Sequence, residues 1–432
     1  MLHLNFSGRF ASSDVFDALS PLFEQNNLRS LHLYGDNYGD GIVVDTEMVY
    51  SLADALEKCR TLEHFSLVCD AFGHEQPSVA ADAWIDLSSC ISDLNSSLES
   101  VRLEYCAQSQ AGGFDAMAEA LGNCTNLDEL FLTDSLYPSD AARKAFFNRL
   151  KDFRSLKECT IDDSNIDDGD IGLMMESLGS ISSLRDLRLS SNTRVTSTGW
   201  EQFVRILQQS NCRLQYLELA CNGTTLDWDM MELTNDIDDD VLIAIAQSLV
   251  NNTTLEGLAV GPNNPLIIRR GWTALANVLC NKSSIDTIYN SNHTLKRVNE
   301  NGGSVDHMKT LGDITGDEGH DEVDKRRIEG RELLHFLKLN ENENKSEVAR
   351  QKIIRYHFVN GEKNMQTFQG IDLALLPHAT AWVGRNVSGL SLLHQLTQSL
   401  PSLFGLSCMA KVAAGGKRKR ELVTDVQSGQ LS

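Results

Sequence analysis

The sequence lacks the long apolar runs of a membrane protein. None of its 432 residues falls in an apolar stretch of eighteen or more, so we expect no transmembrane helix. The first residues, MLHLNFSGRFASSDVF, hold neither a basic cluster nor a long apolar core, and no signal peptide is expected. We therefore predict no membrane partner and a location in the cytoplasm or the nucleus.

The sequence also lacks the motifs of metal sites and of common catalytic sites. Its ten cysteines lie far apart, without a Cys-x-x-Cys pair or a Cys/His cluster at zinc spacing, so reduced and mostly buried thiols are expected. The patterns G-x-x-x-x-G-K-[ST], G-x-S-x-G, H-E-x-x-H and D-x-[DN]-x-[DN]-G are absent, which removes the usual phosphate, nucleophile, zinc and calcium sites. We predict no enzyme, no metal and no cofactor.

Basic residues are scarce in the first 300 positions. Residues 1–300 hold 21 Lys and Arg against 44 Asp and Glu, whereas residues 301–432 hold 17 against 16. The first part thus carries a net charge of −23, which repels phosphate backbones and argues against a nucleic-acid partner. A protein with a basic surface is the partner that this charge favours.

A short leucine pattern, by contrast, is abundant. LRDLRLSSN begins at Leu184, with leucines at offsets 0, 3 and 5 and an asparagine at offset 8. Related segments begin at Leu28, Leu62, Leu98, Leu127, Leu156, Leu214 and Leu255, with a degenerate copy, IDTIYNSNH, at Ile285. Successive starts are 34, 36, 29, 29, 28, 30, 41 and 30 residues apart. Recurrence at this spacing indicates a repeat array.

Each repeat predicts one strand and one helix. Offsets 3 and 5 face the same side of an extended strand, so that side is expected to be the apolar one. The small polar or thiol residue at offset 8, such as Asn192, is expected to bond the backbone where the chain leaves the strand. Helical periodicity follows at 46–59, 112–124, 196–210 and 238–252, and the expected N-caps include Ser139, Thr196 and Asp238.

This alternation resembles the leucine-rich repeat family, L-x-x-L-x-L-x-x-N/C-x-L, in its longer ribonuclease-inhibitor-like form. The resemblance covers residues 1–298. It implies an α/β solenoid shaped like a horseshoe, with parallel strands on the concave side and helices on the convex side. The spacing of 41 contains an acidic stretch at 224–240 with Trp228, which is either a tolerated loop or a protrusion that binds a partner.

The repeat pattern stops after Val298. Residues 299–330 are polar and acidic, and we expect a linker there. Residues 331–408 are expected to form a helical C-terminal cap that covers the last repeat. Residues 409–432 are expected to be a disordered basic tail. Within it, Lys417, Arg418, Lys419 and Arg420 form either a nuclear-import signal, an electrostatic contact or a solvated charge run.

The helical patterns of the predicted cap include two between residues 332 and 358. ELLHFLKLNEN (332–342) fits both a helix and a further repeat, and its helix-forming surroundings favour the helix. SEVARQKIIRYHF (346–358) predicts a helix with apolar residues facing inward. Its cations Arg350, Lys352 and Arg355 are expected to face outward.

The predicted working surface follows from the strand geometry. If offsets 0, 3 and 5 point inward, offsets 2, 4 and 6 point outward on the concave side. In the middle of the array these positions form a carboxylate band edged by aromatic residues, a combination typical of protein interfaces. The candidate partner-binding residues are Tyr34, Arg102, Glu104, Glu129, Phe131, Glu158, Asp162, Asp186, Arg188, Tyr216, Glu218 and Trp228. A passively solvated acidic face is the alternative.

Two histidines on the predicted concave face are candidates for a metal site. We expect His32 and His64 side by side in one column, followed by Arg102 and Phe131. Because that column holds no carboxylate, a metal site is disfavoured and surface contacts are the preferred interpretation.

These observations predict a non-catalytic, protein-binding scaffold whose acidic concave face binds a basic protein. Two alternatives stay open. One is regulation of a small GTPase, because the Ran GTPase-activating protein is similar in fold. The other is inhibition of a basic enzyme by the acidic face. Both alternatives rest on similarity of fold, which alone does not determine function.

Overall fold

The protein divides into two compact units in a computed structural model. The structure describes residues 2–7, 13–24, 27–34, 44–69, 79–106, 113–134, 139–220, 236–261, 267, 269–298, 333–353 and 355–356. The repeat unit comprises Met1–Val278 and Thr294–Leu337, and the C-terminal unit comprises Leu279–His293 and Lys338–Ser432. The predicted linker at 299–330, the predicted tail at 409–432 with Lys417–Arg420, and Trp228 lie outside the described residues.

Ten parallel strands form one sheet in the repeat unit, and their order in the sheet is their order in the chain. Eight of them, β2 to β9, occur at the eight leucine-pattern segments that start between Leu28 and Leu255. The strands are β1 (Leu2–Ser7), β2 (Leu28–Tyr34), β3 (His64–Val68), β4 (Ser100–Glu104), β5 (Glu129–Thr133), β6 (Glu158–Asp162), β7 (Asp186–Arg188), β8 (Tyr216–Glu218), β9 (Gly257–Ala259) and β10 (Arg297–Val298).

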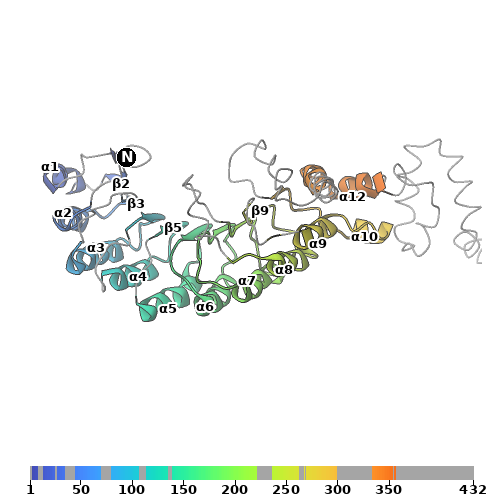
Figure 1. Ribbon diagram of the computed structural model, residues 1–432. Coiled ribbons are helices and arrows are strands. Elements are labelled where there is room, and N and C mark those ends of the chain that lie inside the picture. Colours follow the sequence, from blue (N-terminus) through green and yellow to red (C-terminus); the bar gives the residue numbers. More distant parts are fainter. Residues whose placement is uncertain are drawn as a thin grey trace, which may run out of the picture. The chain divides into compact units, whose positions relative to one another are not determined.

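A helix follows each strand from β1 to β9, and consecutive helices pack against one another along much of the row. The helices form one layer and the sheet another, on the inner side of the helical row (Figure 1). The fold is therefore an α/β leucine-rich-repeat solenoid, as predicted. The helices are α1 (Ser13–Glu24), α2 (Thr46–Glu57), α3 (Ala81–Asp93), α4 (Gly113–Asn123), α5 (Asp140–Arg149), α6 (Asp168–Leu178), α7 (Ser197–Phe203), α8 (Asp239–Leu249) and α9 (Arg269–Leu279).

The core lies between the sheet and the helices. The residues at offsets 0, 3 and 5 of the eight predicted repeats are all buried, from Leu28, Leu31 and Leu33 at one end to Leu255, Leu258 and Val260 at the other. The parallel register places the offset-3 side chain of each repeat opposite its counterpart in the next repeat. Burial of one aliphatic row per strand is the main driving force for stacking the repeats.

The chain leaves several strands through the same tight turn. Tyr105, Asp134, Asp163 and Ser191 stand at offset 7 of four successive repeats, and each has a positive φ between 44° and 58°. Asn192 follows at offset 8 and is fully buried. Its Oδ1 accepts from the Ser164 amide at 3.0 Å, and its Nδ2 donates to the Ile161 carbonyl at 2.7 Å. The offset-8 side chain therefore satisfies backbone groups of two repeats, as the sequence indicated.

The predicted helix N-caps are confirmed by their hydrogen bonds. The side chain of Ser139 accepts from the Ala142 amide, that of Thr196 from the Gly199 amide, and that of Asp238 from the Val241 amide. These bonds satisfy amides that have no partner within the helix.

Both ends of the array differ from the prediction. The degenerate copy at Ile285 is not a strand, because Ile285–Tyr289 forms helix α10, which starts with a capping box between Ser284 and Thr287. The last strand, β10, begins twelve residues after Ile285. At the other end, β1 was not predicted, although LHLNFS alternates apolar and polar residues as a half-buried strand does.

The C-terminal unit contains α10 and α12 (Lys345–Ile353). Residues 333–340 are also helical, so the preferred interpretation of ELLHFLKLNEN is confirmed there. The outward orientation predicted for Lys352 is wrong, since this residue is fully buried. Its ammonium group donates to the Leu279 carbonyl at 2.6 Å and to Asn340 Oδ1 at 2.9 Å. Within the described parts of the chain, no helix is long and apolar enough to cross a membrane.

Candidate partner-binding surface

The open face of the sheet, the side away from the helices, presents offsets 2 and 4 in two columns that the strand register defines. The first column runs through Ser30, His64, Ser100, Glu129, Glu158, Asp186, Tyr216 and Gly257. The second runs through His32, Ser66, Arg102, Phe131, Thr160, Arg188, Glu218 and Ala259. Eight of the twelve candidate residues lie in these two columns.

The predicted pairing of the two histidines is wrong. His64 lies opposite Ser30, and His32 lies opposite Ser66. The reason is their place in the repeat: His32 is four residues after Leu28, whereas His64 is only two residues after Leu62. The structure thus brings His32, Arg102 and Phe131 into one column and puts His64 in the other.

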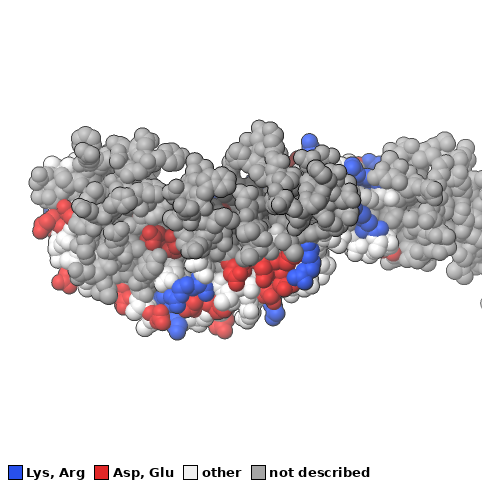
Figure 2. Space-filling view, viewed as in Figure 1, with Lys and Arg blue, Asp and Glu red and all other residues white. Residues whose placement is uncertain are grey.

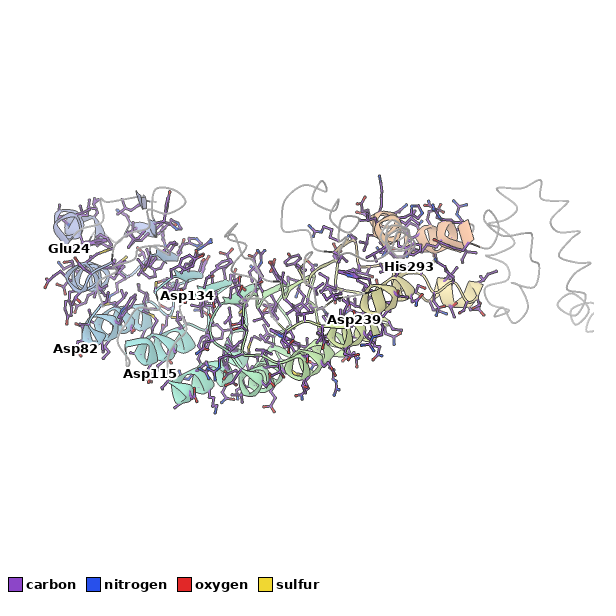
Figure 3. All side chains as sticks on the ribbon, viewed as in Figure 1. Glu24, Asp82, Asp115, Asp134, Asp239 and His293 are labelled. Atoms are coloured by element: carbon purple, nitrogen blue, oxygen red, sulfur yellow. The ribbon has the colours of Figure 1, made fainter. Side chains whose placement is uncertain are left out.

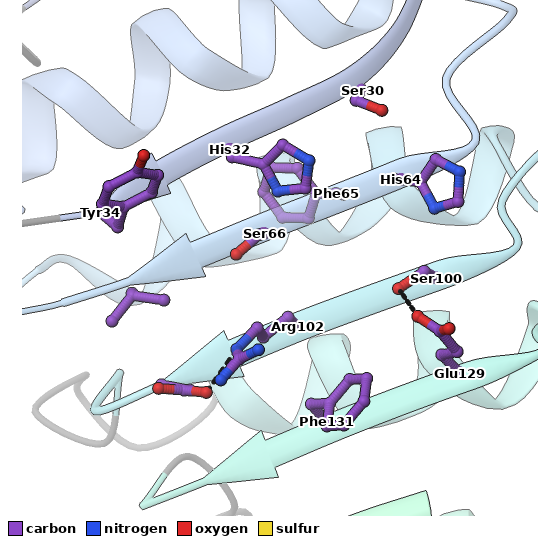
Figure 4. A pocket seen from close by; sticks show the side chains of 12 residues that line it. Ser30, His32, Tyr34, His64, Phe65, Ser66, Ser100, Arg102, Glu129 and Phe131 are labelled. Carbon is purple, nitrogen blue, oxygen red and sulfur yellow. Dashed lines mark hydrogen bonds and ion pairs between the residues drawn. The ribbon is translucent and has the colours of Figure 1, made fainter. Parts of the chain in front are cut away.

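A hollow of about 680 Å³ lies over β2 to β5 on this face. Figure 4 shows His32 and His64 from neighbouring strands at this hollow, with Tyr34, Arg102 and Phe131 further along its wall. Tyr34 is exposed and Phe131 is partly exposed. The hollow therefore offers aromatic and imidazole surface beside the carboxylate-rich strands.

Two arginines neutralise part of the acidic band. Arg188 forms a two-pronged ion pair with Asp186, at 3.0 and 3.1 Å, and its guanidinium lies 5.3 Å from the ring centroid of Tyr216. Arg102 pairs through its Nε with Glu104, two residues along the same strand, at 2.5 Å, and lies 5.3 Å from the ring centroid of Phe131. Each arginine is thus held between a carboxylate and an aromatic ring.

Three consecutive carboxylates remain in one line, which we name the carboxylate column: Glu129, Glu158 and Asp186. Glu129 accepts a hydrogen bond from Ser100 at 2.9 Å, and Asp186 binds Arg188. The Glu158 side chain forms no hydrogen bond or ion pair with any residue that the structure describes. Burial, together with the charges of Asp186 and Glu129, raises the pKa of Glu158, against the opposing effect of the charge on Arg188. This carboxylate is the least compensated of the three.

Asp162 and Glu218 are more enclosed than the sequence suggested. Burial raises the pKa of Asp162 to about 7, although its carboxylate accepts a hydrogen bond from the Ser190 amide at 2.6 Å. Glu218 is only 2% exposed, and its carboxylate accepts a hydrogen bond from the Tyr216 hydroxyl at 3.1 Å. Both carboxylates therefore accept hydrogen bonds from neighbouring strands or side chains of the sheet and are less available to a partner.

The two columns end at Gly257 and Ala259, and the glycine has a steric reason. A Cβ atom on Gly257 would lie 2.6 Å from the Tyr216 ring. Only glycine therefore allows the Tyr216 ring to rest over the next strand. Because Tyr216 also contacts Arg188 and Glu218, Gly257 helps to fix the orientation of both charged residues.

Acidic residues are not confined to the open face. Figure 2 shows acidic and basic side chains together on the helical side of the repeat unit. Asp82 and Asp115 lie on helices α3 and α4, whereas Asp134 follows a strand (Figure 3). Some helical acids are paired, as Arg270 is with Asp240 at 2.7 Å. Acidity alone thus does not distinguish the open face from the helical side. What distinguishes it is the combination of Glu158, which has no ion pair among the described residues, with the aromatic residues Phe131 and Tyr216 on the same face.

The described residues contain no group of three or more His, Cys, Asp or Glu side chains placed to hold a metal ion. Eight described cysteines form no disulfide, and all except Cys212 are buried.

No protein-family model matches the sequence, and no curated protein matches it. Among solved structures, 76 chains match. One is the crystal structure of the Rad7 and Elc1 complex in yeast, with 14% sequence identity over 68% of this chain and 68% of that chain and a TM-score of 0.33. A similarity this distant carries no argument about this protein, and its fold rests on its own strand order and register.

Proposed function

We propose that the protein is a non-catalytic scaffold that binds a basic protein on the open face of its sheet. The observation that carries this proposal is the carboxylate column, in which Glu158 lies between Glu129 and Asp186 without an ion pair to any described residue. Parallel strands are about 4.8 Å apart, and like charges at that spacing destabilise the folded state. A lysine or arginine from a partner would remove this repulsion.

The hollow over β2 to β5 supplies the second element of the proposed interface. Its aromatic lining, with Tyr34 exposed and Phe131 partly so, suits an apolar side chain of the partner. Buried aromatic anchors contribute most of the affinity in many interfaces, whereas charges chiefly set orientation and association rate. We propose that the partner binds the hollow and the carboxylate column together.

Buried cysteines that form no disulfide support a reducing compartment, such as the cytoplasm or nucleus. Regulation of a small GTPase and inhibition of a basic enzyme would use the same acidic surface with different partners. Identification of the partner therefore distinguishes these functions from plain scaffolding.

The test compares two triple variants with the same change in charge. The first, Glu129→Gln/Glu158→Gln/Asp186→Asn, neutralises the carboxylate column. The second, Asp82→Asn/Asp86→Asn/Glu119→Gln, neutralises exposed acids of α3 and α4. Partners are first identified by affinity purification and mass spectrometry with the full chain, and each binary affinity is then measured at several salt concentrations.

We expect the column variant to bind at least about tenfold more weakly, with a flatter salt dependence, because several charge pairs are lost. The helix variant should keep both the affinity and most of its salt dependence. Equal weakening in the two variants would mean that total charge alone attracts the partner. Unchanged binding by the column variant would place the interface elsewhere.

A further inference from the structure

Two buried cysteines lie side by side where the chain leaves β3 and β4. The Sγ atoms of Cys69 and Cys106 are 3.3 Å apart, although the residues are 37 positions apart in the sequence. Cys69 is 4% exposed and Cys106 is 2% exposed. The Cys69 amide donates to the Glu104 carbonyl at 3.0 Å, so the backbones are held together at this point.

The position of the two sulfurs suits a covalent bond, because their Sγ atoms are already in contact at 3.3 Å. The sulfurs need to approach by about 1.2 Å to reach a normal S–S distance. In doing so, Cys106 would lose its thiol contact with the Glu104 carbonyl at 3.3 Å. Rotation of the two side chains, without separation of the strands, is the movement required.

We propose that Cys69 and Cys106 form an oxidation site, in which a hydroperoxide converts the two thiols into a reversible disulfide. One thiolate attacks the peroxide, whose O–O bond breaks to leave a sulfenic acid and release water or an alcohol. The second thiol then attacks the sulfenic sulfur, and the S–O bond breaks with release of water. The two thiols lose two protons and two electrons, and the peroxide accepts them.

Burial raises the pKa of Cys90 to about 11 and the pKa values of Cys124 and Cys159 to about 12, which keeps these three as thiols. Cys69 and Cys106 are buried as well. Their advantage is geometric, because each thiol lies in direct contact with a second one that can capture the sulfenic acid as soon as it forms.

The disulfide would act on the wall of the hollow. Val68 and Glu104 line the hollow, and each is within two residues of one of the cysteines. A bond between Cys69 and Cys106 would fix the ends of β3 and β4 relative to each other. It would also restrict the unfolded chain, so the oxidised protein should be more stable.

The test treats the full chain with hydrogen peroxide, blocks the remaining thiols and maps disulfide-linked peptides by mass spectrometry. We expect a linked pair of peptides with Cys69 and Cys106 that dithiothreitol separates, and an increase in Tm of roughly 5 °C. Cys69→Ser should abolish the linked pair, whereas Cys212→Ser should retain it. Oxidation of the partly exposed Cys212 serves as the measure that the peroxide has reacted.

The proposal fails if Cys212 is oxidised while Cys69 and Cys106 are recovered as free thiols after unfolding. It also fails if either cysteine is linked mainly to a different one. Because the peptide map uses the wild-type chain, neither result depends on the folding of a variant. Neither result depends on the proposed partner, because no partner is present in the experiment.

Discussion

At the scale of single residues, two buried cations are the least expected features of the protein. Arg143 is 2% exposed, and Lys352 is fully buried. Helical periodicity assigned Lys352 to the outer side of its helix, because a lysine in a polar pattern is usually solvated. The sequence gives no sign of its acceptors, since the Leu279 carbonyl is 73 positions away. Burial of a cation depends on such distant groups and not on local pattern.

Arg143 joins α5 to α6 through buried charge. Its Nε donates to Asp170 at 2.6 Å, and Asp170 is completely buried. Arg143→Ala should lower the free energy of unfolding by about 3–5 kcal/mol, because it leaves an unpaired buried carboxylate. Urea titration measures this loss. Lys144→Ala, at an exposed site on the same helix, should change stability by no more than about 0.5 kcal/mol.

The double variant Arg143→Ala/Asp170→Ala separates the charge effect from the packing effect. It should be more stable than Arg143→Ala alone, because the carboxylate is no longer buried without a partner. Additive losses in the double variant would show that the ion pair contributes only through the volume of its side chains.

Lys352 should make stability depend on pH. Burial lowers the pKa of Lys352 to about 7 from its ordinary 10.5. Between these values the folded state binds fewer protons than the unfolded state, so the free energy of unfolding of the C-terminal unit should rise with pH. His293, with its pKa lowered to about 4 by burial and by Lys352, contributes only below about pH 6.5.

The measurement is urea unfolding at pH 7, 8 and 9, followed by hydrogen–deuterium exchange in α10 and α12. Lys352→Met should remove much of the increase in stability over this range. Lys338→Met replaces an exposed lysine and should leave the increase in place. A pH dependence that survives in Lys352→Met would assign it to other groups.

At the scale of strands and helices, the leucine spacing predicts those features of the fold that depend on local sequence. Eight strands, the buried offsets and three N-caps follow from leucine spacing and capping residues. The ends of the array do not, because the degenerate Ile285 copy has a capping serine that starts a helix instead. In the candidate surface, spacing gave the columns, whereas the Arg188–Asp186 pair and the burial of Glu218 depend on rotamers.

The turn after β7 should be sensitive to loss of one amide side chain. Asn192→Ala leaves the Ser164 amide and the Ile161 carbonyl without their side-chain partner. We expect the free energy of unfolding to fall by about 3 kcal/mol, because buried backbone groups without partners are costly. Thermal or urea unfolding measures the loss, and Thr193→Ala at the exposed neighbouring position is the matched control. A loss below about 1 kcal/mol would indicate that water replaces the amide.

At the scale of the whole molecule, each repeat contacts mainly the repeats beside it. The strands pair in chain order, and helix packing follows the same order. Stability in such an array is close to a sum of repeat and nearest-neighbour contributions. A destabilising substitution is therefore expected to lower the stability of nearby repeats most and that of distant repeats least. In a globular domain with one core, it would lower the stability of every element.

Asn192→Ala tests this expectation when its exchange is mapped along the chain. Hydrogen–deuterium exchange should increase most in β6, β7 and β8, and little in β2 and β3, because each interface passes on only part of the loss. Thr193→Ala should leave the whole pattern unchanged. A uniform increase across all strands would mean that the repeats unfold as a single cooperative unit. If exchange does decrease with distance from β7, a partner bound over β5 to β7 should also protect those strands from exchange most strongly.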